Sequence, residues 1–130
     1  MNYLLDTDVI IDYLNKKGEA YQLIEELLNR EAVFISVVTL TEVRAGWDKE
    51  TTRKFLPAVS ALFPTISVDD EIALHAGEQL KTYAQQGKTL SVADTLIGAT
   101  AYLHECCLVT RNVKDFPMPY LHLLNPQTKQ

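Results

Sequence analysis

The segment TLSVADTLIGATAYLHECCLVTRNVKDF, residues 89–116, joins a helical pattern to a short apolar strand and ends in polar residues. Ser91 is a good helix N-cap, and the apolar residues behind it recur at spacings of three and four, which predicts a helix with one face in the core. The strand is expected at 106–109. It is followed by a polar cluster that consists of Thr110, Arg111, Asn112 and Asp115. A strand that served packing alone would end in a simple turn, so this cluster marks a candidate site.

The rest of the chain repeats the alternation of strands and helices. Further strands are expected at residues 4–5, 32–38 (ending at Thr39), 65–68 and 120–124. Helices are expected from a cap at Thr7 or Asp8 to Gly18, over 19–30, from Thr39 onward, over 48–63 with a kink or break at Pro57, and from 69 to 86 with a stop at Gly87. This alternation favours parallel pairing. We therefore expect an α/β fold, a three-layer sandwich with a mainly parallel central sheet.

Length and composition indicate an ordinary globular protein. The 130 residues fit one domain, 1–130, with 124–130 as a loose tail. No apolar run is long enough for a membrane span, and the first residues lack a basic segment, so we expect a cytoplasmic protein without a membrane partner. The two cysteines and three histidines lack zinc-ligand spacing.

The net charge of −5 argues at first against a nucleic-acid partner. However, if four of the 17 acids surround a cation, the others nearly balance the 12 lysines and arginines. Net charge therefore decides little about the partner.

Four acids are expected at the same edge of the sheet. Asp6 ends the first strand, Glu42 follows the second, Asp94 opens the helix before the fourth strand, and Asp115 follows that strand. The carboxyl ends of parallel strands form the crevice in which sites of open sheets lie. Carboxylates packed together repel unless hard cations lie between them, and Mg²⁺ and Mn²⁺ prefer oxygen ligands. A cation there can activate water, which suggests phosphodiester hydrolysis.

Each acid also has an ordinary structural interpretation. Ser91–Asp94 and Thr39–Glu42 both match the capping box of a helix start, and Asp6 and Asp115 are common turn residues. Thr110 and Asn112 either end the strand in a turn or orient a carboxylate or water. Arg44, Arg111 and Lys114 are either solvated charges or contacts to substrate phosphates.

Four motifs in order resemble the PIN-domain nucleases, specifically the VapC-type toxins of bacterial toxin–antitoxin pairs. They are LLDTDVIIDYL, VVTLTEVRAG, SVADTLIGATAYLHE and LVTRNVKDF, and together they span nearly the whole chain. The resemblance implies that Asp6, Glu42, Asp94 and Asp115 are the acidic metal-binding and catalytic residues, with Thr110 and Asn112 in support. It also implies an Mg²⁺- or Mn²⁺-dependent endoribonuclease that acts on RNA, a homodimer, and an antitoxin protein that covers the site. Asp8 and Glu105 stand where the family often has another polar residue and a glycine.

Parts of the sequence are also compatible with a phosphatase or with an inactive binding module. Asp6-Thr7-Asp8-Val9 after a strand is similar to the first motif of haloacid-dehalogenase phosphatases, with Asp6 as nucleophile and with Thr39, Lys49 or Lys54, and Asp69 with Asp70 completing the site. That interpretation leaves Asp94 and the cluster after residue 109 unused. An inactive binding module on the same fold was the third alternative.

Overall fold

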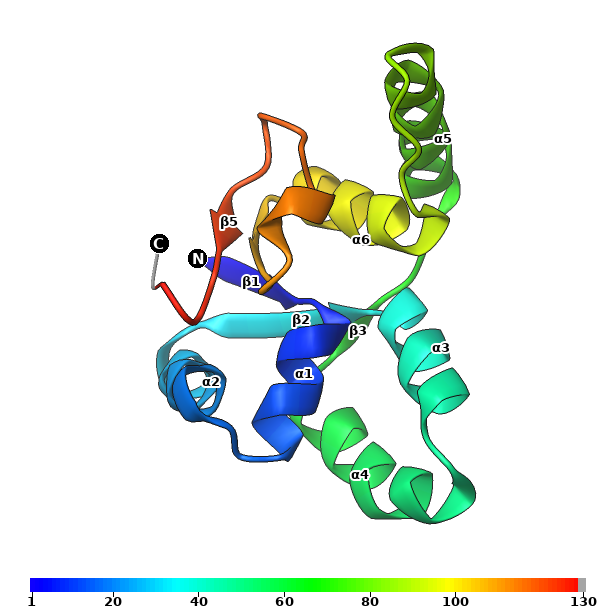
Figure 1. Ribbon diagram of the computed structural model, residues 1–130. Helices are drawn as coiled ribbons and strands as arrows, with labels where there is room; N and C mark the ends of the chain where they lie inside the picture. Colours follow the sequence, from blue (N-terminus) through cyan, green and yellow to red (C-terminus); the bar gives the residue numbers. More distant parts are fainter. Residues whose placement is uncertain (129–130) are drawn as a thin grey trace.

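The computed structural model describes residues 1–128 and contains a five-stranded sheet in the order β3-β2-β1-β4-β5, with every neighbouring pair parallel (Figure 1). The elements in chain order are β1 (Asn2–Leu5), α1 (Thr7–Leu14), α2 (Gly18–Arg30), β2 (Ala32–Ser36), α3 (Val37–Gly46), α4 (Lys49–Leu62), β3 (Thr65–Ile66), α5 (Asp70–Gln85), α6 (Val92–Leu103), β4 (Cys106–Val109), the 3₁₀ turn η1 (Val113–Asp115) and β5 (Leu123–Leu124). The expected α/β sandwich with a parallel sheet is confirmed.

The sheet separates two layers of helices, because successive strand residues point to opposite faces. Leu5 packs with residues of α1, α2 and α4 in one apolar cluster, while its neighbour Leu4 packs with Ile97 of α6 in a second. Helix α5 is attached to the outside of α6 through a smaller cluster that includes Ile72 and Ala99. Figure 1 shows α1, α2 and α4 on one side of the sheet and α5 and α6 on the other.

The segment 89–116 folds as its pattern predicts. Ser91 is the N-cap of α6, and its hydroxyl accepts a hydrogen bond of 3.1 Å from the backbone N–H of Asp94. β4 occupies 106–109 as expected, beside β1 at the centre of the sheet. Gly87, at φ +80°, follows α5 in the left-handed region that ends many helices. These predictions hold because cap, periodicity and stop signal agree.

Two helix starts differ from the predictions. The N-cap of α1 is Asp6 and not Thr7 or Asp8, because the Asp6 carboxylate accepts from the backbone N–H of Thr7. Gly18 does not end α1, which stops at Leu14; it is the first residue of α2. The turn between the two helices is therefore made by residues 15–17.

The second strand is shorter than predicted, because β2 ends at Ser36 and the chain enters α3 at once. The Ser36 hydroxyl accepts from the backbone N–H of Val38 at 3.0 Å, so Ser36 is the helix cap. The prediction that the strand runs to residue 38 and ends at Thr39 is wrong. The alternative interpretation of Thr39 and Glu42 as a capping box is also excluded, because Ser36 caps α3. Val37 and Val38 are β-branched and read as strand, yet the serine cap outweighs that preference.

Two further predictions concern helix α4 and the C-terminal tail. Helix α4 continues through Pro57 without a break. Leu124 pairs with Val109, and Asn125 forms a turn in which its side chain accepts from the N–H of Gln127, so the tail expected to be loose is structured as far as residue 128. Residues 129–130 of that prediction lie outside the described residues. Within residues 1–128 no helix combines the length and apolarity needed to cross a membrane.

Candidate active site

Asp6 lies at the centre of the sheet edge because β1 and β4 pair in register up to Leu5 and Val109. The next residues on each strand, Asp6 and Thr110, therefore meet, and both are buried. The Thr110 hydroxyl donates to Asp6 Oδ2 at 2.8 Å, while the backbone N–H of Thr7 donates to Oδ1 at 2.8 Å. The Thr110 side chain therefore contacts the Asp6 carboxylate through a buried hydrogen bond.

The electrostatics of Asp6 differ from those of an exposed carboxylate. Burial raises its pKa to about 7, and the charges of Asp8 and Asp94 add to the shift. The hydrogen bonds from Thr110 and Thr7 oppose the shift without cancelling it. At neutral pH the Asp6 carboxylate therefore sits in surroundings that disfavour its charge, which is the condition that a bound cation relieves.

Glu42 of α3 and Asp94 of α6 reach the same pocket as Asp6. Burial raises the pKa of Asp94, and the charges of Asp115 and Glu42 are the next causes. Asp6, Glu42 and Asp94 line one open pocket of about 250 Å³, with Thr7, Asp8, Ile11 and Asn112 as the other lining residues. Asp115, in the exposed turn η1, does not line this pocket, but its charge acts on Asp94. The structure thus brings three of the four predicted acids into one pocket and puts the fourth near its rim.

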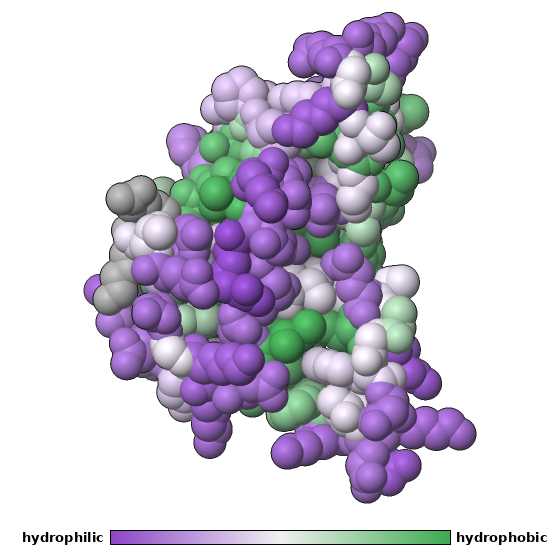
Figure 2. Space-filling view, viewed as in Figure 1, coloured by the Kyte–Doolittle hydropathy of each residue, from purple (hydrophilic) through white to green (hydrophobic). Residues whose placement is uncertain are grey.

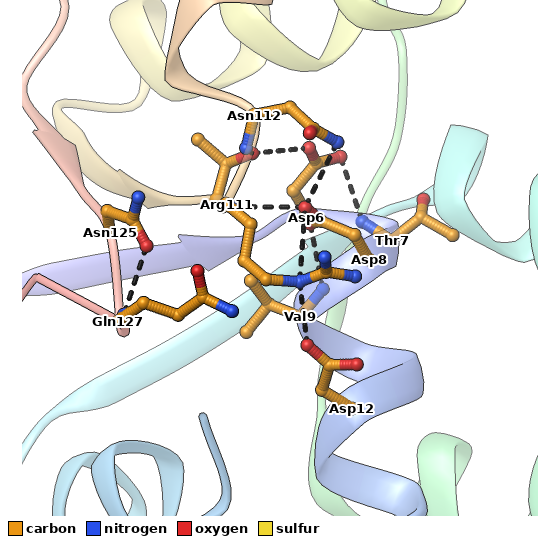
Figure 3. A network of polar contacts seen from close by, with 10 residues as sticks. Asp6, Thr7, Asp8, Val9, Asp12, Arg111, Asn112, Asn125 and Gln127 are labelled. Carbon is orange, nitrogen blue, oxygen red and sulfur yellow. Dashed lines mark hydrogen bonds and ion pairs between the residues drawn. The ribbon is translucent and has the colours of Figure 1, made fainter. Parts of the chain in front are cut away.

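Asp8, whose role the sequence left open, accepts hydrogen bonds from the loop that follows β4. Its Oδ1 accepts from the N–H of Val9, and its Oδ2 accepts from the N–H of Arg111 at 3.0 Å and from the side-chain amide of Asn112 at 3.2 Å. These contacts tie the start of α1 to the loop that follows β4 (Figure 3). The side chain of Asn112, predicted to orient a carboxylate or water, therefore contacts Asp8.

The predicted substrate contacts differ in their surroundings. Arg111 points toward α1, where its Nε lies 2.7 Å from Asp12 Oδ2 and 3.9 Å from Asp8 Oδ2 (Figure 3). Arg44 donates to the backbone carbonyl of Trp47 at 3.2 Å, and Lys114 is exposed in η1. None of the three lines the acidic pocket. Sequence reasoning missed Asp12, although Asp8 and Asp12 are four residues apart and so share one face of α1.

The surface around the pocket is divided by polarity. Figure 2 shows hydrophilic residues gathered at the centre of this face, over the ends of β1 and β4, beside a hydrophobic strip over α1. On α1, the half-exposed side chain of Ile11 lines the acidic pocket itself.

The donor set fits a hard divalent cation in its chemistry, since carboxylate oxygens are the ligands that Mg²⁺ and Mn²⁺ prefer and the mutual repulsion of these acids favours a cation between them. Within residues 1–128, no group of three or more His, Cys, Asp and Glu side chains is arranged so that it could hold a metal ion as it stands. The acids on the helices would therefore have to turn toward Asp6 to complete a coordination sphere.

The sheet, the acids at its carboxyl edge and the sequence together define a family. The model of the PIN domain matches residues 3–117, which is most of the chain. The chain therefore belongs to the PIN-domain family.

Within that family the chain is of the VapC type. Ribonuclease VapC19 of Mycobacterium tuberculosis is 31% identical over 119 residues, which cover 88% of this chain and 92% of the relative. A solved structure of VapBC2 from Rickettsia felis bound to a promoter DNA fragment matches with a TM-score of 0.83 and 28% identity, and covers 96% of this chain and 98% of that one. A toxin–antitoxin complex from Klebsiella pneumoniae matches with a TM-score of 0.77 and 30% identity, over 95% of this chain and 97% of that one.

The structure also separates the residues that the phosphatase alternative required. Asp69 is the N-cap of α5 and Lys49 is the first residue of α4, and neither lines the pocket that contains Asp6. The family assignment and this separation both favour the nuclease interpretation over the phosphatase.

Proposed function

We propose that this PIN domain is an endoribonuclease that hydrolyses RNA phosphodiester bonds with the help of Mg²⁺ or Mn²⁺, and that it acts as the toxin of a toxin–antitoxin pair. The observation that carries the proposal is the convergence of Asp6, Glu42 and Asp94 on one pocket, with the pKa of Asp6 and of Asp94 raised. A relative named as a ribonuclease and a neighbour solved as a toxin–antitoxin complex support the substrate class and the biological role.

Each acid has a separate part in this proposal. Asp6, Asp94 and Asp115 would hold the cation, which supplies Lewis acidity and a water of lowered pKa when it is bound. Glu42 would bind or orient the attacking water. Thr110 would hold the Asp6 carboxylate in one orientation through its 2.8 Å hydrogen bond.

The proposed partners follow from the same family. We propose an antitoxin protein that covers the site until it is released, and a homodimer as the functional form. Because the proposed substrate is RNA, the site of action is the cytoplasm. Of the three cationic side chains considered as substrate contacts, Arg44 and Lys114 are exposed, and the Arg111 guanidinium is engaged by Asp12. Arg44 and Lys114 are therefore the better candidates for phosphate contacts.

The test is cleavage of total cellular RNA by the purified, partner-free protein in Mg²⁺ or Mn²⁺, analysed on a gel. We expect discrete fragments that disappear with EDTA and with Asp94→Asn. The matched control is Asp70→Asn, the same acid-to-amide change at an exposed residue of α5, which should cleave like the natural protein. Intact RNA under all conditions would overturn the ribonuclease proposal.

A second measurement separates an enzyme from an inactive binding module. A cation that binds the folded protein raises its melting temperature, and Asp94→Asn should remove most of that rise. If Mg²⁺ and Mn²⁺ leave the melting temperature of the natural protein unchanged, the binding module becomes the better interpretation. Glu42→Gln should bind the cation but cleave slowly, and equal rates for this variant and the natural protein would refute the role given to Glu42.

A further inference from the structure

Glu42 is held in place by a residue of another helix. Its carboxylate Oε1 accepts a hydrogen bond from the hydroxyl of Thr7, the first residue of α1. Glu42 is only half-buried, and its side chain has three rotatable bonds, so it would otherwise sample many directions at the pocket edge. The direction of its carboxylate therefore depends on a contact that joins α3 to α1.

Thr7 is well placed to orient the Glu42 carboxylate. Its backbone N–H is fixed by the 2.8 Å hydrogen bond to the Asp6 carboxylate, so the two residues are ordered together. A threonine side chain in a helix is largely restricted to two χ1 rotamers, so its hydroxyl can take few directions. The hydroxyl oxygen of Thr39 lies 3.3 Å from that of Thr7.

Thr39 extends the contact along α3. It is completely buried and lies three residues before Glu42, so both side chains project from one face of that helix. The Thr7 hydroxyl thus touches two α3 side chains at once. This arrangement fixes the distance between the helix that carries Glu42 and the strand end that carries Asp6.

We propose that Thr7 is a positioning residue for RNA cleavage: its hydroxyl holds the Glu42 carboxylate toward the pocket that Glu42 shares with Asp6 and Asp94. The inference rests on the proposed function, because it gives Glu42 its role with the attacking water. Thr7 acts through Glu42 and not on the substrate, so its loss lowers kcat and leaves KM unchanged. Loss of a residue that orients a functional group through a hydrogen bond reduces activity by roughly 10- to 100-fold at metal sites.

Two substitutions separate the hydroxyl from the shape of the side chain. Thr7→Val keeps the branched shape and removes the hydroxyl, and we expect kcat to fall by about 10- to 100-fold with KM unchanged. Thr7→Ser keeps the hydroxyl and should restore most of that loss. Thr52→Val is the matched control, since it removes a hydroxyl that bonds only to the backbone of Asp48 on α4, and its kcat should not change.

A double-mutant cycle tests whether Thr7 works through Glu42. In a Glu42→Gln background, Thr7→Val should cause little further loss, because the carboxylate that it positions is already gone. Equal losses in both backgrounds, or a Thr7→Ser variant as impaired as Thr7→Val, would overturn the proposal. Melting temperatures of the variants show whether a loss of kcat reflects unfolding.

A crystallographic measurement decides the inference apart from catalysis. In the natural protein the Glu42 carboxylate should be ordered against the Thr7 hydroxyl, and in Thr7→Val it should occupy several directions or leave the pocket. An unchanged, ordered Glu42 in the variant would refute the positioning role. If the natural protein fails to cleave RNA while Glu42 is reoriented in the variant, the ribonuclease proposal fails and the positioning by Thr7 stands.

Discussion

Replacing Asp6 by Asn should stabilise the metal-free protein at neutral and alkaline pH, although it removes a proposed cation ligand. The Asp6 carboxyl is 5% exposed, and its pKa is raised from 3.8 to about 7 in the folded protein. Between these two values the folded state holds a proton that the unfolded state has released. The free energy of unfolding therefore falls as the pH rises from about 4 to about 7.

The size of the effect follows from the shift. Each pKa unit corresponds to about 1.4 kcal/mol, so the rise from 3.8 to about 7 makes the charged Asp6 cost the fold about 4 kcal/mol above pH 7. Asparagine cannot ionise and fits the same contacts. Its oxygen can accept from the N–H of Thr7, and its amide can donate to the Thr110 hydroxyl, which can accept as well as donate.

The assay is urea unfolding of both proteins in EDTA, at several pH values between about 4 and 8. The stability advantage of Asp6→Asn should grow with pH and level off above about pH 7. Glu78→Gln, at an exposed residue of α5, is the control and should keep the pH profile of the natural protein. Adding Mg²⁺ should remove more than half of this advantage above pH 7, since a ligand at a hundred times its Kd stabilises the natural protein by about 2.7 kcal/mol and the variant binds it poorly. Parallel pH profiles for the natural protein and Asp6→Asn would refute the reasoning.

Three further changes test one hydrogen bond of the site and two backbone positions elsewhere in the fold. Thr110→Val removes the hydrogen bond to the buried Asp6 carboxylate and should lower the free energy of unfolding at pH 8 by about 1.5 to 3 kcal/mol, measured in urea. A loss no larger than that of Thr52→Val would show that a hydrogen bond to a charged, buried group adds no extra stability here. Glu105→Gly should raise the melting temperature, because Glu105 has φ +53°, which costs a non-glycine residue about 1 kcal/mol; a lower melting temperature would show that the side chain contributes more than the strain costs. Gly98→Ala should stabilise α6 by about 0.5 to 1 kcal/mol, because alanine loses less conformational freedom than glycine inside a helix. The new Cβ would lie 3.5 Å from the Phe116 ring, which is an ordinary contact, and destabilisation in urea unfolding would mean that this contact is already too tight.

The parts of the fold that were predictable from the sequence are those with agreeing local signals. α6 and β4 were placed from the Ser91 cap, the apolar spacing and the run of apolar residues, and the structure confirms them. The start of α3 was misplaced because Val37 and Val38 favour strand on their own. Only the folded chain shows that the Ser36 hydroxyl caps the helix at that point.

The candidate site was predictable at the level of strand ends and no further. Parallel pairing puts Asp6 and Thr110 side by side, so their meeting follows from the register. The contact between Thr7 and Glu42 joins residues 35 positions apart and depends on how α3 packs, which no local pattern encodes. Likewise, the sequence left Arg111 open between a solvated charge and a substrate contact. Its ion pair with Asp12 could not be predicted, because it arises only when the loop after β4 meets α1.

The two outer strands have a consequence for how this protein behaves at high concentration. The edge strands β3 and β5 contain two residues each, so each of them offers a neighbouring molecule only a very short row of free backbone groups. Very short edge strands resist pairing with extended segments of other chains, and such pairing is how many aggregates begin to grow. The central strand β1 is paired with β2 on one side and with β4 on the other. The fold therefore keeps β1 away from the edges of the sheet and ends the sheet in two strands that are too short to be good templates for an extended segment of another chain.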